Sequence, residues 1–303
     1  MSALAEKLRL LRGQAGIAAQ VPSVGAALPE ALRATMSAAA PASTSTPRIG
    51  GVPEELRRLL GIRARAGVSG LATLTRAHPA DRELPGTELA PGLRLVERLL
   101  PFEGVPAIVE LGFAKDNGPT PRGRLLHFDT ETTGLAGGTG TRAFMIGAAD
   151  WHAGGLRLRQ LMISSMAAEA AMLEAFAAWL QPDSVLVSYN GRCYDAPLLS
   201  TRYRLARQRN PLAGLAHADL LFPVRRRFRG IWENCRLATV EKNWLRVLRE
   251  DDLPGAEAPR AWLDYLRGGS ARDLRRVLQH NDRDLVSLGE LCLKLAEPDA
   301  AAA

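Results

Sequence analysis

The chain has 303 residues and a mass of 32.7 kDa, which allows one sizeable domain with additional segments or two small domains. Hydrophobic residues make up 47% and charged residues 23%, so the chain as a whole is not intrinsically disordered. The formal net charge of +7 permits a polyanionic partner without requiring one, because all but four of the 39 basic residues are arginine and part of that bias is compositional.

The three cysteines, Cys193, Cys235 and Cys292, are far apart and form no CxxC pair. This spacing argues against a disulfide framework and a cysteine-based zinc site, and it fits a reducing compartment. Charges interrupt the apolar residues of the N-terminus, so no signal peptide is expected. The most apolar long stretch, residues 161–180, carries two glutamates. We therefore expect a soluble, cytoplasmic protein with no membrane-spanning segment.

The first part of the chain differs in composition from the rest. Alanine, proline, serine and threonine dominate residues 21–51, and such a segment cannot bury enough apolar surface to offset its ordering entropy. Short helices are expected near the N-terminus and from Pro53 onward. We predict three regions: a largely linker-like N-terminal extension over residues 1–90, one α/β domain over 91–297, and a disordered tail over 298–303.

The second part alternates between strand and helix patterns. Runs rich in β-forming residues occupy residues 93–98, 124–131, 143–150, 156–163 and 184–189. Helical periodicity occupies residues 167–180, 196–209, 236–248, 259–267 and 271–295. Paired glycines separate the second, third and fourth runs, which predicts an antiparallel meander. The fifth run follows a helix and can return in parallel, so we predict a mixed α/β sheet flanked by helices.

Two acids close the second predicted strand, in the segment HFDTETTGL. Asp129 and Glu131 are two residues apart, so on a strand their side chains point to the same face. Two carboxylates on one face of an apolar strand repel each other unless a cation lies between them. A hydrated strand end would explain the pair equally well, and the pair alone favours neither interpretation.

A third acid, Asp195, stands where the fifth strand gives way to a helix, in VSYNGRCYDAPLL. Taken alone, Asp followed by Ala-Pro is best interpreted as a helix N-cap. A capping role and a metal-binding role are compatible, since one oxygen can cap while the other faces a cation.

The late helix contains the segment QHNDRDLVSL. His280 and Asp284 are four residues apart and therefore lie on one helical face, whereas Asp282 lies on another and is expected to be solvated. The alternative is an exposed polar stripe beside a leucine seam.

These motifs, taken in order, resemble the DEDD 3′–5′ exonuclease superfamily of ribonuclease H-like folds. Within it, the likeness is to the YprB-type ribonuclease H-like domain, and it covers residues 124–296. The segments that carry it are DTETTGLAGGTGTRAF (129–144), SYNGRCYDAPLLSTRY (188–203), HADLLFPVRR (217–226), NCRLATVEK (234–242), REDDLPGAEAP (249–259) and HNDRDLVSL (280–288).

The resemblance implies a hydrolase that cleaves phosphodiester bonds with two divalent cations, Mg²⁺ or Mn²⁺. It assigns the four metal-binding carboxylates to Asp129, Glu131, Asp195 and Asp284. Hard oxygen ligands suit Mg²⁺ or Mn²⁺ better than structural zinc. In such sites one ion activates water and the other stabilises the leaving oxygen.

His280 departs from the pattern of the superfamily, which places either a tyrosine four residues before the last aspartate or a histidine five before it. Here a histidine stands at the tyrosine spacing. Our hypothesis is that it orients or deprotonates the attacking water, because an imidazole titrates near neutral pH. A packing role for this histidine is the alternative.

Contacts to nucleic acid are expected at three places. By resemblance, Thr132, Thr133, Gly134 and Leu135 meet the 3′-terminal nucleotide, although a plain turn is equally compatible. We also expect contacts from Asn190 and Tyr194. Residues 202–229 contain eight arginines against Asp219 alone, with Tyr203, Phe222 and Phe228 as candidate stacking residues, and we assign backbone binding to Arg225, Arg226 and Arg227. A solvated arginine face is the alternative.

Other acidic and glycine-rich motifs receive structural interpretations. Residues 137–142 lack the ending of a phosphate loop and lead into a strand, so a hairpin turn is predicted. Asp219 and the pair at 251–252 are interpreted as turn, cap or supporting groups.

The favoured function is stepwise hydrolysis of DNA or RNA from a 3′ end. The alternatives are a nucleic-acid-binding platform with a weak or silent metal site, and an internally cleaving ribonuclease H-like endonuclease. The sequence does not distinguish DNA from RNA or single strand from duplex.

Overall fold

The computed structural model describes residues 81–115, 117–134, 139–249 and 252–297. All of them belong to one compact unit, Thr73–Ala303. The predicted extension lies outside the described residues except for its last ten positions, and so does all of the predicted tail. Those ten positions include a strand of the main sheet, β1.

The core is a seven-stranded mixed sheet in the order β1-β2-β7-β6-β5-β8-β9, which confirms the predicted fold class. Strands β1, β2, β7, β6 and β5 pair antiparallel, whereas β8 and β9 continue the sheet in parallel from β5. The strands span Thr87–Ala90 (β1), Leu93–Pro101 (β2), Leu125–Thr132 (β5), Ala143–His152 (β6), Gly155–Ile163 (β7), Val185–Ser188 (β8) and Ala216–Asp219 (β9). A separate two-stranded sheet joins β3 (Ile108–Glu110) to β4 (Pro119–Pro121).

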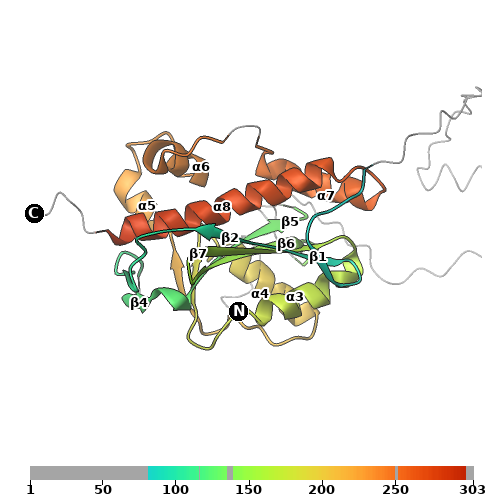
Figure 1. Cartoon of the computed structure of the whole chain (residues 1–303), viewed down its shortest axis with the longest axis horizontal. Helices are drawn as coiled ribbons and strands as arrows, with labels where there is room; N and C mark the ends of the chain where they lie inside the picture. Colours follow the sequence, from blue (N-terminus) through green and yellow to red (C-terminus); the bar gives the residue numbers. More distant parts are fainter. Residues whose placement is uncertain (1–80, 116, 135–138, 250–251, 298–303) are drawn as a thin grey trace, which may run out of the picture. The chain divides into compact units, whose positions relative to one another are not determined.

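Helices cover both faces of this sheet. Figure 1 shows α8 across one face, with α3 and α4 on the opposite face. The helices span Glu169–Ala177 (α3), Asp195–Leu205 (α4), Leu221–Phe228 (α5), Leu237–Val240 (α6), Ala258–Leu266 (α7) and Arg272–Ala296 (α8). Short helical turns span Arg122–Arg124 (η2), Met166–Ala168 (η3), Glu241–Leu245 (η4, a π turn) and Gly255–Glu257 (η5).

Alternation along β5 sorts its side chains between the two helical layers. Phe128 points toward α3, where its ring lies 6.3 Å from that of Phe176. Asp129, the next residue, points to the other layer and accepts a hydrogen bond from Asn281 of α8. Because successive side chains of a strand alternate, Glu131 also belongs to the α8 side. The apolar residues of β5 thus anchor the strand, and its acids meet α8.

The approach of α8 to the sheet depends on Gly147 of β6, which lies opposite Asp129 in the ladder. A Cβ atom at this position would come within 2.1 Å of Oδ1 of Asn281. Asn281 is fully buried, and its Oδ1 accepts a hydrogen bond of 2.9 Å from Nε2 of Gln160 on β7. Glycine at 147 therefore leaves room for the amide that connects α8 to the acidic strand.

Two parts of the fold differ from the predicted elements. The short elements β9 and α5 lie in residues without strong periodicity, and α5 carries a proline. One helix is expected over residues 236–248. The α-helical part covers only α6, which ends at Val240, and the π turn η4 follows it directly. The first residue of this turn, Glu241, is buried. Single-turn π segments are common at functional sites.

None of the helices within the described residues is apolar enough over its length to cross a membrane. Even α8, which has 25 residues, carries charged side chains along its length.

Gly147→Ala is expected to destabilise the domain by about 1–3 kcal/mol, the usual cost of overpacking a closely packed core. The added methyl would push the amide of Asn281 away from Asp129. Gly140→Ala is the matched control, because a Cβ there meets no atom within 4 Å. Urea unfolding of both variants measures the difference, and equal midpoints would contradict the account given for Gly147.

Candidate active site

Asp129 and Glu131 lie near the C-terminal end of β5, in the middle of the sheet. Oδ2 of Asp129 accepts a 2.9 Å hydrogen bond from Nδ2 of Asn281, whereas the Glu131 carboxylate has no hydrogen-bond donor among the described residues. Glu131 is nonetheless buried, with 7% of its surface exposed. A buried carboxylate without a donor is a strong candidate for a cation ligand.

Asp195 is the first residue of α4 and lies beside β5. The hydroxyl of Thr130 donates a hydrogen bond to its Oδ1. The preceding residue, Tyr194, holds the N-cap position, and no side chain caps this helix. The N-cap interpretation of Asp195 is therefore wrong, because the chain turns into the helix one residue earlier and the carboxylate is held from the strand.

Asp284 lies on α8, three residues after Asn281, so both side chains face the sheet on one side of the helix. A guanidinium N–H of Arg249 donates to Oδ1 of Asp284. The four predicted carboxylates thus come from β5, from the start of α4 and from α8.

The negative charges of these four groups affect one another's pKa values. Burial raises the pKa of Asp129 well above its ordinary value, and the negative charges of the other three acids raise it further. Burial also raises the pKa of Glu131, with Asp284 and Asp195 adding to the effect. The pKa of Asp195 rises to about 6 through burial, despite the hydrogen bond from Thr130. Burial raises the pKa of Asp284 as well, and Arg249 opposes it only in part.

The chemistry of this donor set fits Mg²⁺ or Mn²⁺, since every side chain offers carboxylate oxygen. Among the described residues, however, no three His, Cys, Asp or Glu side chains lie close enough together to hold an ion as they stand. Asp129, Asp195 and Asp284 each turn one oxygen to a protein donor. The site therefore has the ligands and the excess negative charge for a cation, and Asp284 is engaged by an arginine instead.

Arg249 connects the site to elements that the sequence motifs do not mark. Its guanidinium donates two hydrogen bonds of 2.6 Å to the buried carboxylate of Glu241, and a third of 3.0 Å to Asp252. Ser287 of α8 donates a further 2.6 Å bond to Glu241. Both residues lie in segments that carry the resemblance, NCRLATVEK and REDDLPGAEAP, but neither is singled out as a site residue.

His280 faces this cluster from α8. Its Nδ1 lies 2.9 Å from a carboxylate oxygen of Asp252, and its Nε2 lies 3.7 Å from Oδ2 of Asp284. Burial raises the pKa of Asp252, but hydrogen bonds from Arg249 and His280 outweigh it and hold the pKa below its ordinary value. Asp252 is thus the supporting group that its place in the sequence predicts, and it directs Nε2 of His280 toward Asp284.

A cavity of about 420 Å³ opens beside Asp129 and Asp195. Of the residues predicted to contact a 3′-terminal nucleotide, Thr132, Gly134 and Tyr194 line it, and Tyr194 is 60% exposed. Thr133 instead closes the predicted hairpin through two hydrogen bonds with the backbone N–H and carbonyl of Arg142. Leu135 lies outside the described residues.

Asn190 has a structural task in the loop that leads to Asp195. It adopts the left-handed conformation, with φ of 68°, which asparagine tolerates better than most residues. Its backbone N–H donates a 2.7 Å bond to Asp219, whose carboxylate also accepts the N–H groups of Arg192 and Leu221. Asp219 therefore acts as the predicted supporting group, since it holds this loop against α5.

The arginine-rich window divides between buried, bonded and exposed side chains. Arg202 is buried and donates bonds of 2.6 and 2.7 Å to Glu169, and Tyr203 is fully buried and cannot stack on a base. Arg226 donates to the carbonyl of Phe113, and Arg227 lies over the ring of Trp244. Arg225 is exposed and lines a different hollow.

Asp282 also differs from its prediction, because it is paired rather than merely solvated. Its two oxygens accept bonds of 2.7 and 2.6 Å from the guanidinium of Arg98 on β2. This pair attaches α8 to the antiparallel part of the sheet.

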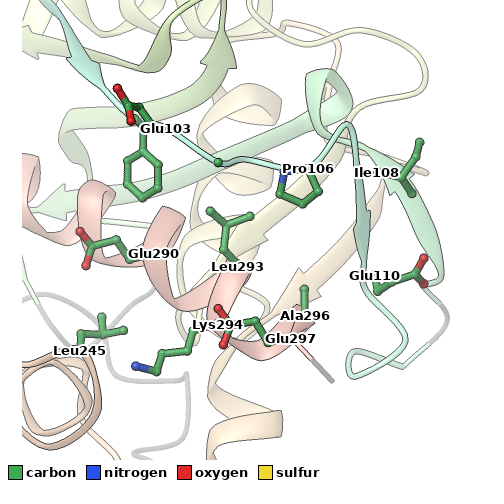
Figure 2. Close-up of a pocket in the computed structure, with 12 residues that line it drawn as sticks. Glu103, Pro106, Ile108, Glu110, Leu245, Glu290, Leu293, Lys294, Ala296 and Glu297 are labelled. Carbon is green, nitrogen blue, oxygen red and sulfur yellow. The ribbon is translucent and has the colours of Figure 1, made fainter. Parts of the chain in front are cut away.

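A larger hollow lies elsewhere in the described part of the domain. It has a volume of about 630 Å³ and borders the C-terminal turns of α8, where Figure 2 shows Glu290, Leu293 and Lys294 on the helix and Pro106 on a neighbouring loop, with Lys294 directed toward Leu245. None of the predicted site residues lines it. Cavity size alone would therefore misplace the site.

Asp129→Asn is expected to stabilise the metal-free domain at alkaline pH. A carboxyl group whose pKa is raised by folding contributes stability at low pH and loses it as the pH rises through the folded pKa. Removing the charge should raise the melting temperature in EDTA at pH 8 by about 2–4 °C for each kcal/mol of relieved repulsion. The gain should shrink as the pH falls, because the raised pKa lets the wild-type group take up a proton more readily in the folded state.

The matched control is Asp264→Asn, which removes an exposed carboxylate on α7. Melting curves at pH 5, 6, 7 and 8 provide the comparison. A variant that melts below the wild type at pH 8 would contradict the proposed repulsion.

The chain is similar to part of two known proteins. The chain is 34% identical over 187 residues to the "Uncharacterized protein YprB" of Bacillus subtilis (strain 168), which is 61% of this chain and 43% of that protein. The chain thus spans less than half of the length of this curated relative. Among solved structures, it is similar to the family B DNA polymerase from the hyperthermophilic archaeon Pyrobaculum calidifontis, with a TM-score of 0.47 and 20% identity over 60% of this chain and 25% of the polymerase.

A family model described as the RNase_H superfamily matches residues 126–296, from β5 to the end of α8. This range includes β5, β6, β7, β8 and β9 together with all four carboxylates. Because the match spans more than half of the chain, the chain belongs to the ribonuclease H superfamily.

Proposed function

We propose that this domain is a metal-dependent nuclease that hydrolyses phosphodiester bonds and removes nucleotides stepwise from a 3′ end of DNA or RNA. Membership of the ribonuclease H superfamily supports a role in nucleic-acid processing. The chemistry proposed here rests on the site itself, because the fold alone does not determine the reaction.

The observation that carries the proposal is a set of four buried carboxylates from three segments that raise one another's pKa, two of which line one cavity. Asp129 and Asp195 line the cavity, and the charges of Glu131 and Asp284 reach Asp129. Burying several like charges together is costly unless a cation balances them. Divalent cations balance such charge while leaving the oxygens available as ligands.

In this proposal Asp129, Glu131, Asp195 and Asp284 would hold two Mg²⁺ or Mn²⁺ ions. Bound there, the ions supply an activated water and stabilise charge on the leaving oxygen. The protein groups position the ligands: Asn281 orients Asp129, and Thr130 orients Asp195. The cavity beside them would receive the terminal nucleotide, with Tyr194 at its mouth.

His280 is the proposed general base. The carboxylate of Asp252 accepts a hydrogen bond from Nδ1, which leaves Nε2 as the nitrogen that faces the site and can take a proton from water. Asp252 would hold the ring in this orientation and stabilise the positive charge that forms.

A second function deserves a test because Arg249 engages Asp284. If Arg249 holds that carboxylate permanently, the domain binds nucleic acid without cutting it and serves as a platform. An endonuclease would use the same acids on an internal bond.

Asp129→Asn and Asp284→Asn should each reduce hydrolysis by at least about 100-fold, because metal ions contribute several kcal/mol of transition-state stabilisation. The assay uses matched DNA and RNA oligonucleotides with a 3′ label in Mn²⁺ buffer. Released mononucleotides indicate an exonuclease, internal fragments an endonuclease, and binding without products a platform. Asp264→Asn is the control, and undiminished hydrolysis by Asp129→Asn would overturn the site assignment.

His280→Ala should separate catalysis from metal binding. Loss of a general base typically reduces turnover by about 10²–10⁴-fold. The variant should retain the rise in melting temperature that Mn²⁺ causes, whereas Asp284→Asn should lose both turnover and that rise. The control is Gln279→Ala, an exposed neighbour on α8. Near-normal turnover in His280→Ala would show that the histidine only packs.

A further inference from the structure

A third hollow, of about 400 Å³, lies between the end of α5 and the segment that follows it. We call it the arginine pocket, because Arg225, Arg229 and Arg236 line it together with Trp232, Glu233 and Asn234. The chain folds back at this point: Trp232 stacks on Phe228 with ring centres 3.8 Å apart and planes inclined by 8°. Trp232, held by this stacking contact, thus forms part of the wall of the pocket beside the three arginines.

The three guanidinium groups have no acidic partner within the described part of the chain. Among the described residues, none of the three side chains makes an ion pair or a hydrogen bond, and all three are exposed. Some arginines elsewhere in the domain are paired, as Arg98 is with Asp282 and Arg202 with Glu169, whereas these three line one hollow together. Three positive charges gathered around one hollow repel one another, and Glu233 supplies only one negative charge against them.

The pocket is connected to the candidate active site through one loop. The hydroxyl of Tyr189 donates a 2.7 Å bond to the carbonyl of Cys235, which lines the pocket. Tyr189 opens the loop that ends at Asp195, and Asp219 holds that same loop to the first residue of α5. Because β8 and β9 are parallel, the loop after β8 and the start of α5 lie at the same edge of the sheet.

Phosphodiester groups are the ligands that suit this arrangement. A guanidinium binds phosphate oxygens through paired N–H donors, and several arginines side by side bind successive phosphates of one strand. The amide nitrogen of Asn234 adds a neutral donor, since its oxygen already accepts bonds from Arg236 N–H and Thr239.

We propose that the arginine pocket binds phosphates of a nucleic-acid strand whose end lies in the candidate active site. This inference rests on the proposed function and specifies its substrate: a polynucleotide strand that continues beyond the bond that is cleaved, rather than a dinucleotide or a mononucleotide ester. The pocket anchors the strand, and the carboxylates act on its end.

The test compares Arg229→Ala/Arg236→Ala with the control Arg260→Ala, which removes an exposed arginine on α7. Binding of a fluorescent single-stranded 20-mer is measured by anisotropy in the Asp129→Asn background across a salt series. The double variant should bind about tenfold more weakly, and its log–log salt slope should fall by about 1.4, since each lost phosphate contact on a single strand accounts for about 0.7. Unchanged affinity and slope would overturn the proposal.

A kinetic comparison tests the substrate class. On an otherwise wild-type protein, the double variant should lower kcat/KM for the 20-mer about tenfold and leave kcat/KM unchanged for the p-nitrophenyl ester of thymidine 5′-monophosphate, which is too small to reach both sites. An equal loss on both substrates would overturn the anchoring role. If neither substrate is hydrolysed by the wild type, the proposed nuclease fails, while the anisotropy result still decides on the pocket.

An acidic protein segment is the competing ligand. A poly-glutamate peptide should bind the wild type far more weakly than the 20-mer at equal salt. If the peptide binds as tightly as the 20-mer and the double variant loses that binding, the pocket is a protein-docking surface and the proposal is wrong.

Discussion

The hydrogen bond from Asn281 to Asp129 connects the long helix to the acidic strand, and the candidate site depends on it. Asn281 can reach the strand only because residue 147 has no side chain, and Gln160 fixes the orientation of its amide. A buried amide with both ends bonded allows only one rotamer and one register of α8. The same contact therefore positions Asp129 and, one turn later, Asp284.

The site carries more negative charge than its own basic side chains balance. Arg249 is shared among Glu241, Asp252 and Asp284, while Asp129 and Glu131 have no basic side chain bonded to them among the described residues. The domain thus gives up stability at this edge of the sheet and recovers it in the apolar layers on both faces, where Phe144 stacks on Trp262 and the leucines of α8 are buried. An excess of buried charge of this kind is typical of functional sites.

Runs of β-forming residues and helical periodicity predicted the sheet and its principal helices, because β5 and β6 are mostly apolar segments buried on both faces and α8 buries one apolar side. Spacing placed Asp129 and Glu131 on one face of a strand, but the set of four acids with Asp195 and Asp284 came from the resemblance of the ordered motifs to the DEDD exonucleases. Arg249, Glu241 and Asn281 could not be predicted, because each is a single polar residue whose burial arises only from contacts distant in the sequence. Within the arginine window, Arg202 and Tyr203 are buried because α4 packs one side against the domain, whereas the assignment of backbone binding to Arg225, Arg226 and Arg227 stays a prediction. The assignment of the four acids to metal ions stays a prediction.

The distance along the chain between the strand and the helix has a consequence for biosynthesis. Asp129 and its partner Asn281 are separated by 152 residues, and Asp284 follows still later. A ribosome exposes the strand long before it releases the helix, and long-range contacts of this kind form late in folding. An emerging chain therefore holds the first two acids without the fourth. Assembly of the complete cluster coincides with completion of the fold, so a partly made domain carries no intact site.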